Sequence, residues 1–330
     1  MSADRNSQRI VIAGASSLLG AELKTLLEES RFAGWDLRLV DEENVAGTLT
    51  EAGGEAAVIQ RVEEGSFHKA RFVFFCGSAV FTKANLAAAR EAGAAIIDLS
   101  GGALVGAKGR VWFPFQEAPD SNISLYVIPS AAGAIAGHLL DALGRAGLYR
   151  LALVFHRPVS EAGREGIEEL ESQCAQLLSF QTVGQRVFDT QVAYSLLDRY
   201  GASSKENLAK ERERIRQEAG AAVGKNGVEP SVQLVHAPVF YGYTFSAIAE
   251  INSQQKQEAL TENLKKAGID VQESASMPLG NLSAAGDSTI HLGIPEHDPA
   301  QPGTWWLWGA ADNIRLPAWN AVKLADKLEG

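Results

Sequence analysis

The residues with the clearest chemical meaning form a short glycine turn near the N-terminus. The stretch GASSLLG, from Gly14 to Gly20, follows the β-branched run 10–13 and opens a helical pattern over 20–29. Glycine permits a tight turn, and the amides at a helix N-terminus can hold a pyrophosphate. The spacing belongs to a looser variant of the G-x-G-x-x-G fingerprint, so a glycine turn without a ligand is the alternative. The dinucleotide-binding residues predicted here are Gly14, Ser16, Ser17, Leu18, Leu19 and Gly20.

An acidic residue follows the second predicted strand. Asp41 lies about twenty residues beyond the glycine turn, where a carboxylate accepts hydrogen bonds from an adenosine ribose. Glu42 and Glu43 come next, and three carboxylates repel a 2′-phosphate. The sequence therefore predicts NAD in preference to NADP, and a polar loop without a ligand is the alternative.

Strand and helix patterns alternate through the first 130 residues. Apolar runs at 37–40, 71–75 and 94–99 predict buried strands, and 84–91 predicts a helix that Gly93 ends. This alternation is typical of a parallel, doubly wound sheet. A further strand at 125–128 ends at Pro129, and Ser130 suits the N-cap of a helix that runs to about residue 148.

Beyond residue 150 the strand-like runs are longer and no longer alternate with helices, which predicts an α+β domain. The stretch 205–218 carries nine charges, five basic and four acidic, and predicts a solvated helix. A last helical pattern at 317–328 could return to the first domain. We therefore expect a Rossmann-like α/β domain at 1–130 plus 313–330 and an α+β substrate or dimerisation domain at 131–312.

Composition narrows the class of protein. The 330 residues include 30 basic and 40 acidic side chains, a net charge of −10, which argues against nucleic acid or an anionic membrane as the main partner. The two cysteines lie in unrelated contexts without metal-ligand spacing, so neither a metal site nor a disulfide framework is predicted. A polar start and the lack of a long apolar run predict a cytoplasmic protein without a membrane span.

Several ordered segments resemble one family, the semialdehyde dehydrogenases, and most closely the aspartate-β-semialdehyde dehydrogenases. GASSLLG is similar to the family's GATGxVG turn, and FFCGSAVFTKANLAAAREAGAAIIDLSG to its FSAGGSVS segment with the helix and IDNSS strand end that follow. SEAGREGIEEL resembles SGAGxxGxxEL, KENLAKERERI a Lys- and Glu-bearing helix, HAPVFYGYTFSAIAEI the RVPVxxGHS strand, and ADNIRLPAWNAVKLAD the DNLxKGAAxNAVQIAE segment. The resemblance covers nearly the whole chain.

The resemblance implies interconversion of an acyl phosphate and an aldehyde through a cysteine thioester, with a histidine moving protons and arginines holding substrate anions. In IPSAAG the nucleophile position is Ala131, and a methyl group cannot attack a carbonyl. Ser130 is adjacent but lacks an evident base, and packing is the simpler role for Cys76 and Cys174. The family's first chemical step is therefore lost.

Other positions of the family's chemistry are also substituted. By the same resemblance, the substrate arginine position is His236, the proton-transfer histidine is Tyr243, and Arg157 replaces a glutamine. The phosphate-binding arginine falls on Leu104, a helix lysine falls on Asn207, and Glu211 is kept. The pocket positions are thus Ala131, Arg157, Glu211, His236 and Tyr243, with no confident catalytic residue among them.

Asn313 resembles the family's nicotinamide-side asparagine, and a helix N-cap is the alternative role. Ser17 stands where the family has its middle glycine, so it would narrow the approach of a pyrophosphate, and cofactor binding could be absent. The tryptophans near residue 306 suit either a dimer contact or a core.

We interpret the sequence as a homologue without the thioester activity that acts as a homodimeric nucleotide- or small-anion-binding or regulatory protein. The alternatives are an NAD(H)-dependent oxidoreductase with Tyr243 as acid and Arg157 as carboxylate clamp, and a partner that modulates a competent family member.

Overall fold

The computed structural model describes residues 8–104, 106–107, 109–116, 119–120, 122–223, 227–252, 254–274 and 277–330. The chain divides into two compact units. Unit 1 comprises Met1–Ser130 and Pro317–Gly330, and unit 2 comprises Ala131–Leu316. Among the described residues, no helix is both long and apolar enough to cross a membrane.

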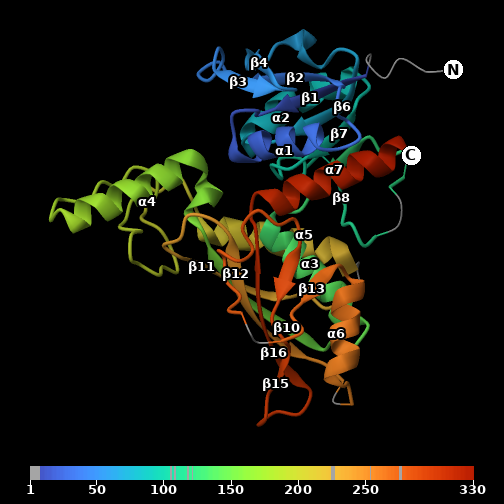
Figure 1. Ribbon diagram of the computed structural model, residues 1–330, viewed down its shortest axis with the longest axis vertical. Coiled ribbons are helices and arrows are strands. Elements are labelled where there is room, and N and C mark those ends of the chain that lie inside the picture. The colour runs from blue at the N-terminus through green and yellow to red at the C-terminus, as the bar shows by residue number, and fades with distance from the viewer. Residues whose placement is uncertain are drawn as a thin grey trace. The chain divides into compact units, whose positions relative to one another are not determined.

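Unit 1 is a parallel sheet with helices on both faces (Figure 1). The strand order is β5-β2-β1-β6-β7-β9-β8. Its strands are β1 (Arg9–Ala13), β2 (Asp36–Asp41), β5 (Gln60–Arg61), β6 (Ala70–Phe75), β7 (Ala95–Asp98), β8 (Arg110–Val111) and β9 (Leu125–Val127). Neighbouring strands pair in parallel throughout. A small hairpin of β3 (Leu49–Ala52) and β4 (Glu55–Val58) and the 3-10 turn η2 (Glu64–Phe67) complete the unit.

The alternation of side chains along β1 explains why helices cover both faces of this sheet. Ile10 and Ile12 join the core under α1 (Leu18–Glu28) and α7 (Arg315–Glu329), whereas Val11 and Ala13 join the core under α2 (Ala79–Glu91). Successive residues of a strand point to opposite faces. Every residue of β1 after Arg9 is buried, as expected for a central parallel strand.

Unit 2 is built on a mixed sheet with the order β11-β10-β12-β16-β14-β13, and β15 pairs with β16. The strands are β10 (Arg150–Arg157), β11 (Ser231–His236), β12 (Tyr243–Glu250), β13 (Ile269–Val271), β14 (Ile290–Leu292), β15 (Glu296–His297) and β16 (Thr304–Ala311). One face packs on α3 (Ala131–Gly144), α5 (Leu208–Val223) and α6 (Gln257–Lys266). The predicted fold class, a Rossmann-like domain with a second α+β domain, is confirmed.

A separate arm of unit 2 consists of α4 (Gly163–Leu178) and the loop that follows it (Figure 1). The 3-10 turn η3 (Val159–Ala162) leads into it. Two buried side chains of α4 organise the loop, because Glu169 accepts hydrogen bonds from the amides of 186–188 and Gln173 bonds the backbone at 184, 190, 192 and 193. These contacts satisfy backbone groups of the loop, which also pairs with β11 through reciprocal bonds between Leu197 and His236.

Some predicted boundaries differ from the observed ones. The helix predicted at 84–91 begins at Ala79, because Ser78 accepts a hydrogen bond from the amide of Phe81 and caps it. The helix predicted to reach about residue 148 ends at Gly144.

Candidate functional site

The glycine turn of unit 1 is tight because two glycines admit neighbouring backbone. Gly14 has φ +89°, and a Cβ there would overlap the amide of Gly77. A Cβ on Gly20 would meet the carbonyl of Gly14. Within the part of the chain that the structure describes, the amides of Leu18 and Leu19 at the start of α1 have no acceptor. Such amides can bind an anion.

The side chains of Ser17 and Asp41 both stabilise this turn through hydrogen bonds to its backbone. The Ser17 hydroxyl accepts from the amide of Gly20 at 2.9 Å, and it lies 2.8 Å from the carbonyl oxygen of Gly14 and 2.9 Å from that of Cys76. Asp41 is 6% exposed, and its carboxylate accepts from the amides of Ser16 and Glu42, each at 2.8 Å. Five amides of the turn are therefore already paired within the protein, those of Gly14, Ala15, Ser16, Ser17 and Gly20.

Ala131 is the first residue of α3 and is 1% exposed. The next turn of this helix faces a buried carboxylate, because a Cβ on Gly133 would overlap the side chain of Glu218. Glu218 is fully buried and pairs with Arg214 at 2.8 Å. The prediction that 205–218 forms a solvated helix is therefore wrong for one face of α5, where Leu208, Ile215 and Glu218 are buried.

Arg157 and His236 lie side by side at the ends of β10 and β11, since the strand register pairs them. Arg157 is 2% exposed, and it donates from Nη1 to the Tyr200 hydroxyl at 3.2 Å and from Nη2 to Glu206 at 2.5 Å. Tyr200 in turn lies 3.2 Å from His236 Nδ1, and His236 Nε2 lies 3.2 Å from the carbonyl oxygen of Val192. Because a carbonyl only accepts, we assign the His236 proton to Nε2.

Burial sets the ionisation of this chain of hydrogen bonds. Burial lowers the pKa of His236 to about 4, and the charge of Arg157 adds to this, while the bond to Val192 opposes it. Burial also raises the pKa of Tyr200. Burial disfavours the charge on Arg157, yet the neighbouring Tyr200 and Glu206 hold its pKa well above the ordinary value. Arg157 is thus a permanent cation, and the groups that follow its Nη1 atom, Tyr200 and His236, are neutral.

Tyr243, Glu161 and Asn313 form a second group beside Arg157. Tyr243 is 2% exposed, and burial, followed by the charge of Glu161, raises its pKa well above the ordinary value. Burial likewise raises the pKa of Glu161. Asn313 donates to Glu161 at 2.9 Å and accepts from the amide of Gly242 at 2.9 Å. Glu211, half-buried on α5, raises the pKa of both Tyr243 and Glu161.

Asn313 does not cap the C-terminal helix. Its neighbour Asp312 accepts from the amides of Ile314 and Arg315 at 2.8 and 2.9 Å, which is the capping pattern. Asn313 instead joins η3 to the turn before β12, through Ser160, Glu161 and Gly242.

Neither cysteine lies on α3. Cys76 follows β6, and burial raises the pKa of its thiol far above the ordinary value. Cys174 lies on α4. Across the described ranges, no three His, Cys, Asp or Glu side chains gather in a way that could hold a metal ion.

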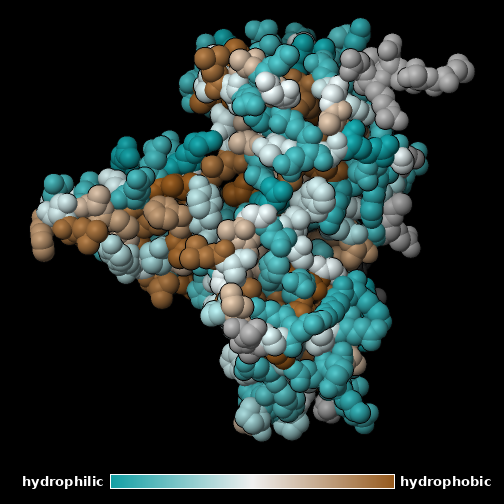
Figure 2. Space-filling model, in the orientation of Figure 1, coloured by the Kyte–Doolittle hydropathy of each residue, from teal (hydrophilic) through white to brown (hydrophobic). Residues whose placement is uncertain are grey.

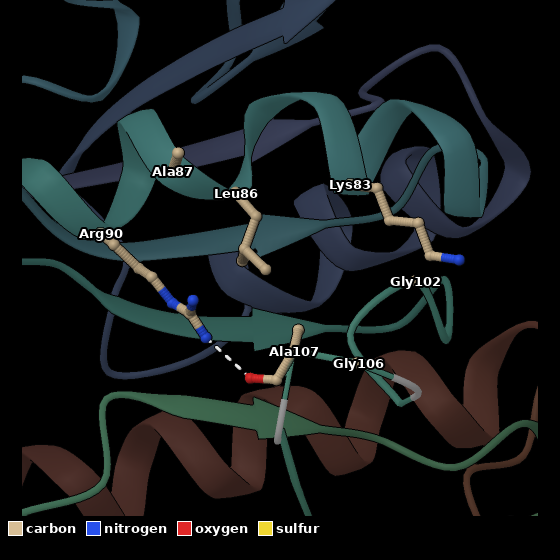
Figure 3. Close-up of a pocket in the computed structure, with 7 residues that line it drawn as sticks. All are labelled: Lys83, Leu86, Ala87, Arg90, Gly102, Gly106 and Ala107. Atoms are coloured by element: carbon tan, nitrogen blue, oxygen red, sulfur yellow. Dashed lines mark hydrogen bonds between the residues drawn. The ribbon is translucent and has the colours of Figure 1, made fainter.

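A shallow pocket in unit 1 contains none of the predicted site residues. It lies between α2 and the loop after β7, with a volume of about 500 Å³, and Arg90 at its edge donates to the carbonyl of Ala107 at 2.8 Å (Figure 3). The loop is fixed by buried Asp98, which accepts from the amides of Ser100 and Ala103. Leu104, where the resemblance places the family's phosphate-binding arginine, is a half-buried apolar residue of this loop.

A parallel sheet with a glycine turn at the carboxyl end of its first strand, followed by an α+β unit, defines a two-domain dinucleotide-binding protein. The chain belongs to the semialdehyde dehydrogenase family: residues 9–110 match the family's NAD binding domain, and residues 140–316 match its dimerisation domain.

Relatives and solved structures agree with this assignment. The chain is 29% identical over 335 residues to a USG-1 protein homolog of Azotobacter vinelandii and 24% identical over 341 residues to an aspartate-semialdehyde dehydrogenase of Shewanella violacea, each match covering 97% of both chains. A probable aspartate-semialdehyde dehydrogenase structure from Pseudomonas aeruginosa shares 28% identity over 98% of both chains, with a TM-score of 0.86. Aspartate semialdehyde dehydrogenase II from Vibrio cholerae, at 23% identity and 98% coverage of both chains, has a TM-score of 0.87 and shows the same fold.

Sequence reasoning missed the residues that hold Arg157. Tyr200 and Glu206 lie 43 and 49 residues from it along the chain, in a loop without a strand or helix pattern. Glu161 was also missed, although it stands within the SEAG motif.

Proposed function

We propose that this chain is a homodimeric member of the semialdehyde dehydrogenase family that binds a nicotinamide dinucleotide and a small anion but does not carry out the thioester reaction. The observation that carries the proposal is the methyl group of Ala131 at the start of α3, the position where the family resemblance places the nucleophile. A thioester requires a thiolate. The two cysteines of the chain do not occupy that position: burial raises the pKa of the Cys76 thiol far above its ordinary value, and Cys174 lies on α4.

The glycine turn supports dinucleotide binding. The unpaired amides of Leu18 and Leu19 and the close backbone approach at Gly14 suit a pyrophosphate. A bound dinucleotide would supply or accept a hydride. The carboxylates of Asp41 and Glu42 favour NAD(H), because they would repel a 2′-phosphate.

Calorimetric titration with NADH and NADPH tests this part of the proposal. We expect NADH to bind more tightly than NADPH, and we expect Asp41→Asn to reduce that preference. Asp36→Asn is the matched control, because Asp36 lies at the other end of β2 and is exposed. Failure of the folded protein to bind either dinucleotide would overturn the cofactor proposal.

The open face of the unit 2 sheet supports a homodimer. Cross-strand rows join Ala152, Ile248 and Trp306, and Val154, Ser246 and Trp308. The two tryptophans are 43% exposed, and their Nε1 atoms donate to Asp298 and to the carbonyl of Leu279, which leaves the rings as an apolar surface. This face belongs to the segment that matches the dimerisation domain. Apolar side chains also gather on the arm (Figure 2), where Leu178 and Phe180 are exposed.

Sedimentation velocity tests the dimer. Ser246→Arg places a charge in the middle of the open face and should yield monomer at micromolar concentration. Leu49→Arg, at an exposed position of unit 1, should leave the dimer intact. A wild-type monomer would overturn the proposed homodimer, and a Ser246→Arg dimer would overturn the proposed face.

A second candidate function is direct reduction of a carbonyl by NADH, with Tyr243 as acid and Arg157 as clamp. The observation in its favour is that Tyr243, which like any tyrosine carries its proton at neutral pH, lies within the electrostatic reach of Arg157, whose charge lowers the tyrosine pKa against the larger effect of burial. A screen of small aldehydes for NADH oxidation tests it. Activity that survives both Tyr243→Phe and Arg157→Ala would exclude these roles.

A further inference from the structure

Arg157 is a buried cation whose donors are only partly matched. Nη1 and Nη2 bond Tyr200 and Glu206, but Nε has no acceptor among the described residues although the side chain is 2% exposed. A buried donor without an acceptor is costly, and native proteins rarely keep one without a reason. Arginine binds carboxylates with two parallel bonds from one edge of the guanidinium, and here only one bond to Glu206 is made.

The two partners of this ion pair are held with different firmness. Arg157 ends β10, which is paired with β11 on one side and β12 on the other. Glu206 lies in the loop just before α5, and its side chain is 24% exposed. The loop is fastened to the arm: Gly201 and Ser203 donate to Phe188 and Asp189, and Ser204 and Lys205 donate to the carbonyl of Val187. Lys205 also pairs with Glu165 of α4. A shift of this loop would free Nη2 while the sheet stays in place.

The opposite side of the guanidinium cannot exchange so easily. Tyr200 is fixed between Arg157 and His236, and its ring packs against Phe188 at 4.8 Å between centroids. The exchangeable donors of Arg157 are therefore Nε and Nη2. Glu206 shows that a carboxylate can bind at this edge, because its oxygen accepts a hydrogen bond from Nη2.

We propose that the Nε and Nη2 edge of Arg157 is a binding site for the carboxylate of a small ligand, and that Glu206 closes the site by occupying Nη2 when no ligand is bound. This inference rests on the anion-binding part of the proposed function and adds the ligand class and its internal competitor. A ligand carboxylate would accept from both nitrogens, whereas Glu206 accepts from one. The ligand must displace Glu206, so the apparent affinity is lowered by the fraction of molecules that are closed.

Succinate, a dicarboxylate without other functional groups, is the probe. Calorimetric titration should show that Glu206→Gln binds succinate about tenfold more tightly than the wild type, because the neutral amide competes less well for the cation. Glu171→Gln is the matched control, because Glu171 is an exposed carboxylate of α4 in the same unit. It should bind succinate as the wild type does. Glu206→Asp, which keeps the charge but shortens the reach, serves if Glu206→Gln fails to fold, and it should also bind more tightly than the wild type.

Arg157→Lys, introduced together with Glu206→Gln, should abolish the gain, because lysine keeps the charge but lacks the planar edge. Equal or weaker succinate binding by Glu206→Gln would overturn the proposal, as would a gain that survives Arg157→Lys. An equal gain for inorganic phosphate would overturn the assignment of a carboxylate. NADH binding measured on the same samples distinguishes failure of this inference from failure of the cofactor proposal. If the wild type binds NADH but Glu206→Gln binds succinate no more tightly than the wild type, only this inference is refuted. If the wild type does not bind NADH, the cofactor part of the proposed function is refuted.

Discussion

His236 should make the stability of unit 2 depend on pH between about 4 and 6.5. Its ordinary pKa of 6.5 falls to about 4 in the folded chain, so in this range the unfolded state binds more protons than the folded state. Stability conferred by the neutral imidazole is therefore present above pH 6.5 and is lost as the pH falls toward 4. The linkage relation gives a loss of about 2 kcal/mol between pH 7 and pH 5.

The perturbation that isolates this effect is His236→Gln. Glutamine does not titrate, and its amide can still donate toward the Val192 carbonyl that His236 contacts. Burial raises the pKa of Glu161, which acts in the opposite direction because its protonated form is favoured in the folded state. That contribution is common to both proteins and cancels in the difference between them.

Amide hydrogen exchange of peptides from β10 and β11, corrected for the intrinsic pH dependence, reads the opening free energy of unit 2 alone. The wild type should lose about 2 kcal/mol more than His236→Gln from pH 7 to pH 5. His297→Gln, at an exposed position of the same unit, should follow the wild type. An identical pH profile for the wild type and His236→Gln would refute the assignment of a buried neutral imidazole.

Three further substitutions test other parts of the structure. Glu169→Gln should lower the opening free energy of the loop 184–193 by about 2 kcal/mol, because three amides share that carboxylate. Hydrogen exchange of this loop measures the change, and Glu168→Gln, at the exposed neighbouring position, is the control. Equal exchange in Glu169→Gln and the wild type would contradict the prediction. Gly14→Ala should cost more than Gly34→Ala in thermal unfolding, since both glycines have positive φ but only a Cβ at Gly14 would overlap backbone; equal losses would contradict this. Ala131→Cys should not create aldehyde oxidation in a dinucleotide absorbance assay, because by the family resemblance Tyr243 and His236 replace the histidine and the arginine of the reaction. Turnover would show that the cysteine alone was missing.

The sequence was sufficient to predict the fold because its signals are local. The buried strands of unit 1 are short apolar runs, and the turn between β1 and α1 is formed by consecutive residues from Gly14 to Gly20. Longer strand-like runs beyond residue 150 predicted the second unit as an α+β domain, and ordered motifs resembled one family over nearly the whole chain. Boundaries moved where a cap decided them, as at Ser78.

The candidate site could be predicted only in part, because its contacts are long-range. Arg157, His236 and Tyr243 were chosen by resemblance, and the structure places Arg157 and His236 on adjacent strands. The groups that determine their state, Glu206 and Tyr200, come from a loop ordered by the buried polar side chains Glu169 and Gln173 of α4. A charged residue in sequence predicts exposure, yet Glu218 is fully buried because Arg214 pairs with it.

The central claim is that the family scaffold persists here without the covalent chemistry. The most direct measurement is dinucleotide absorbance at 340 nm during incubation of the folded protein with aspartate semialdehyde, inorganic phosphate and either NAD or NADP. The substitution at Ala131 predicts no turnover above the buffer blank with either cofactor. Turnover at a rate of about 1 per second or faster, which is ordinary for an enzyme, would contradict the account.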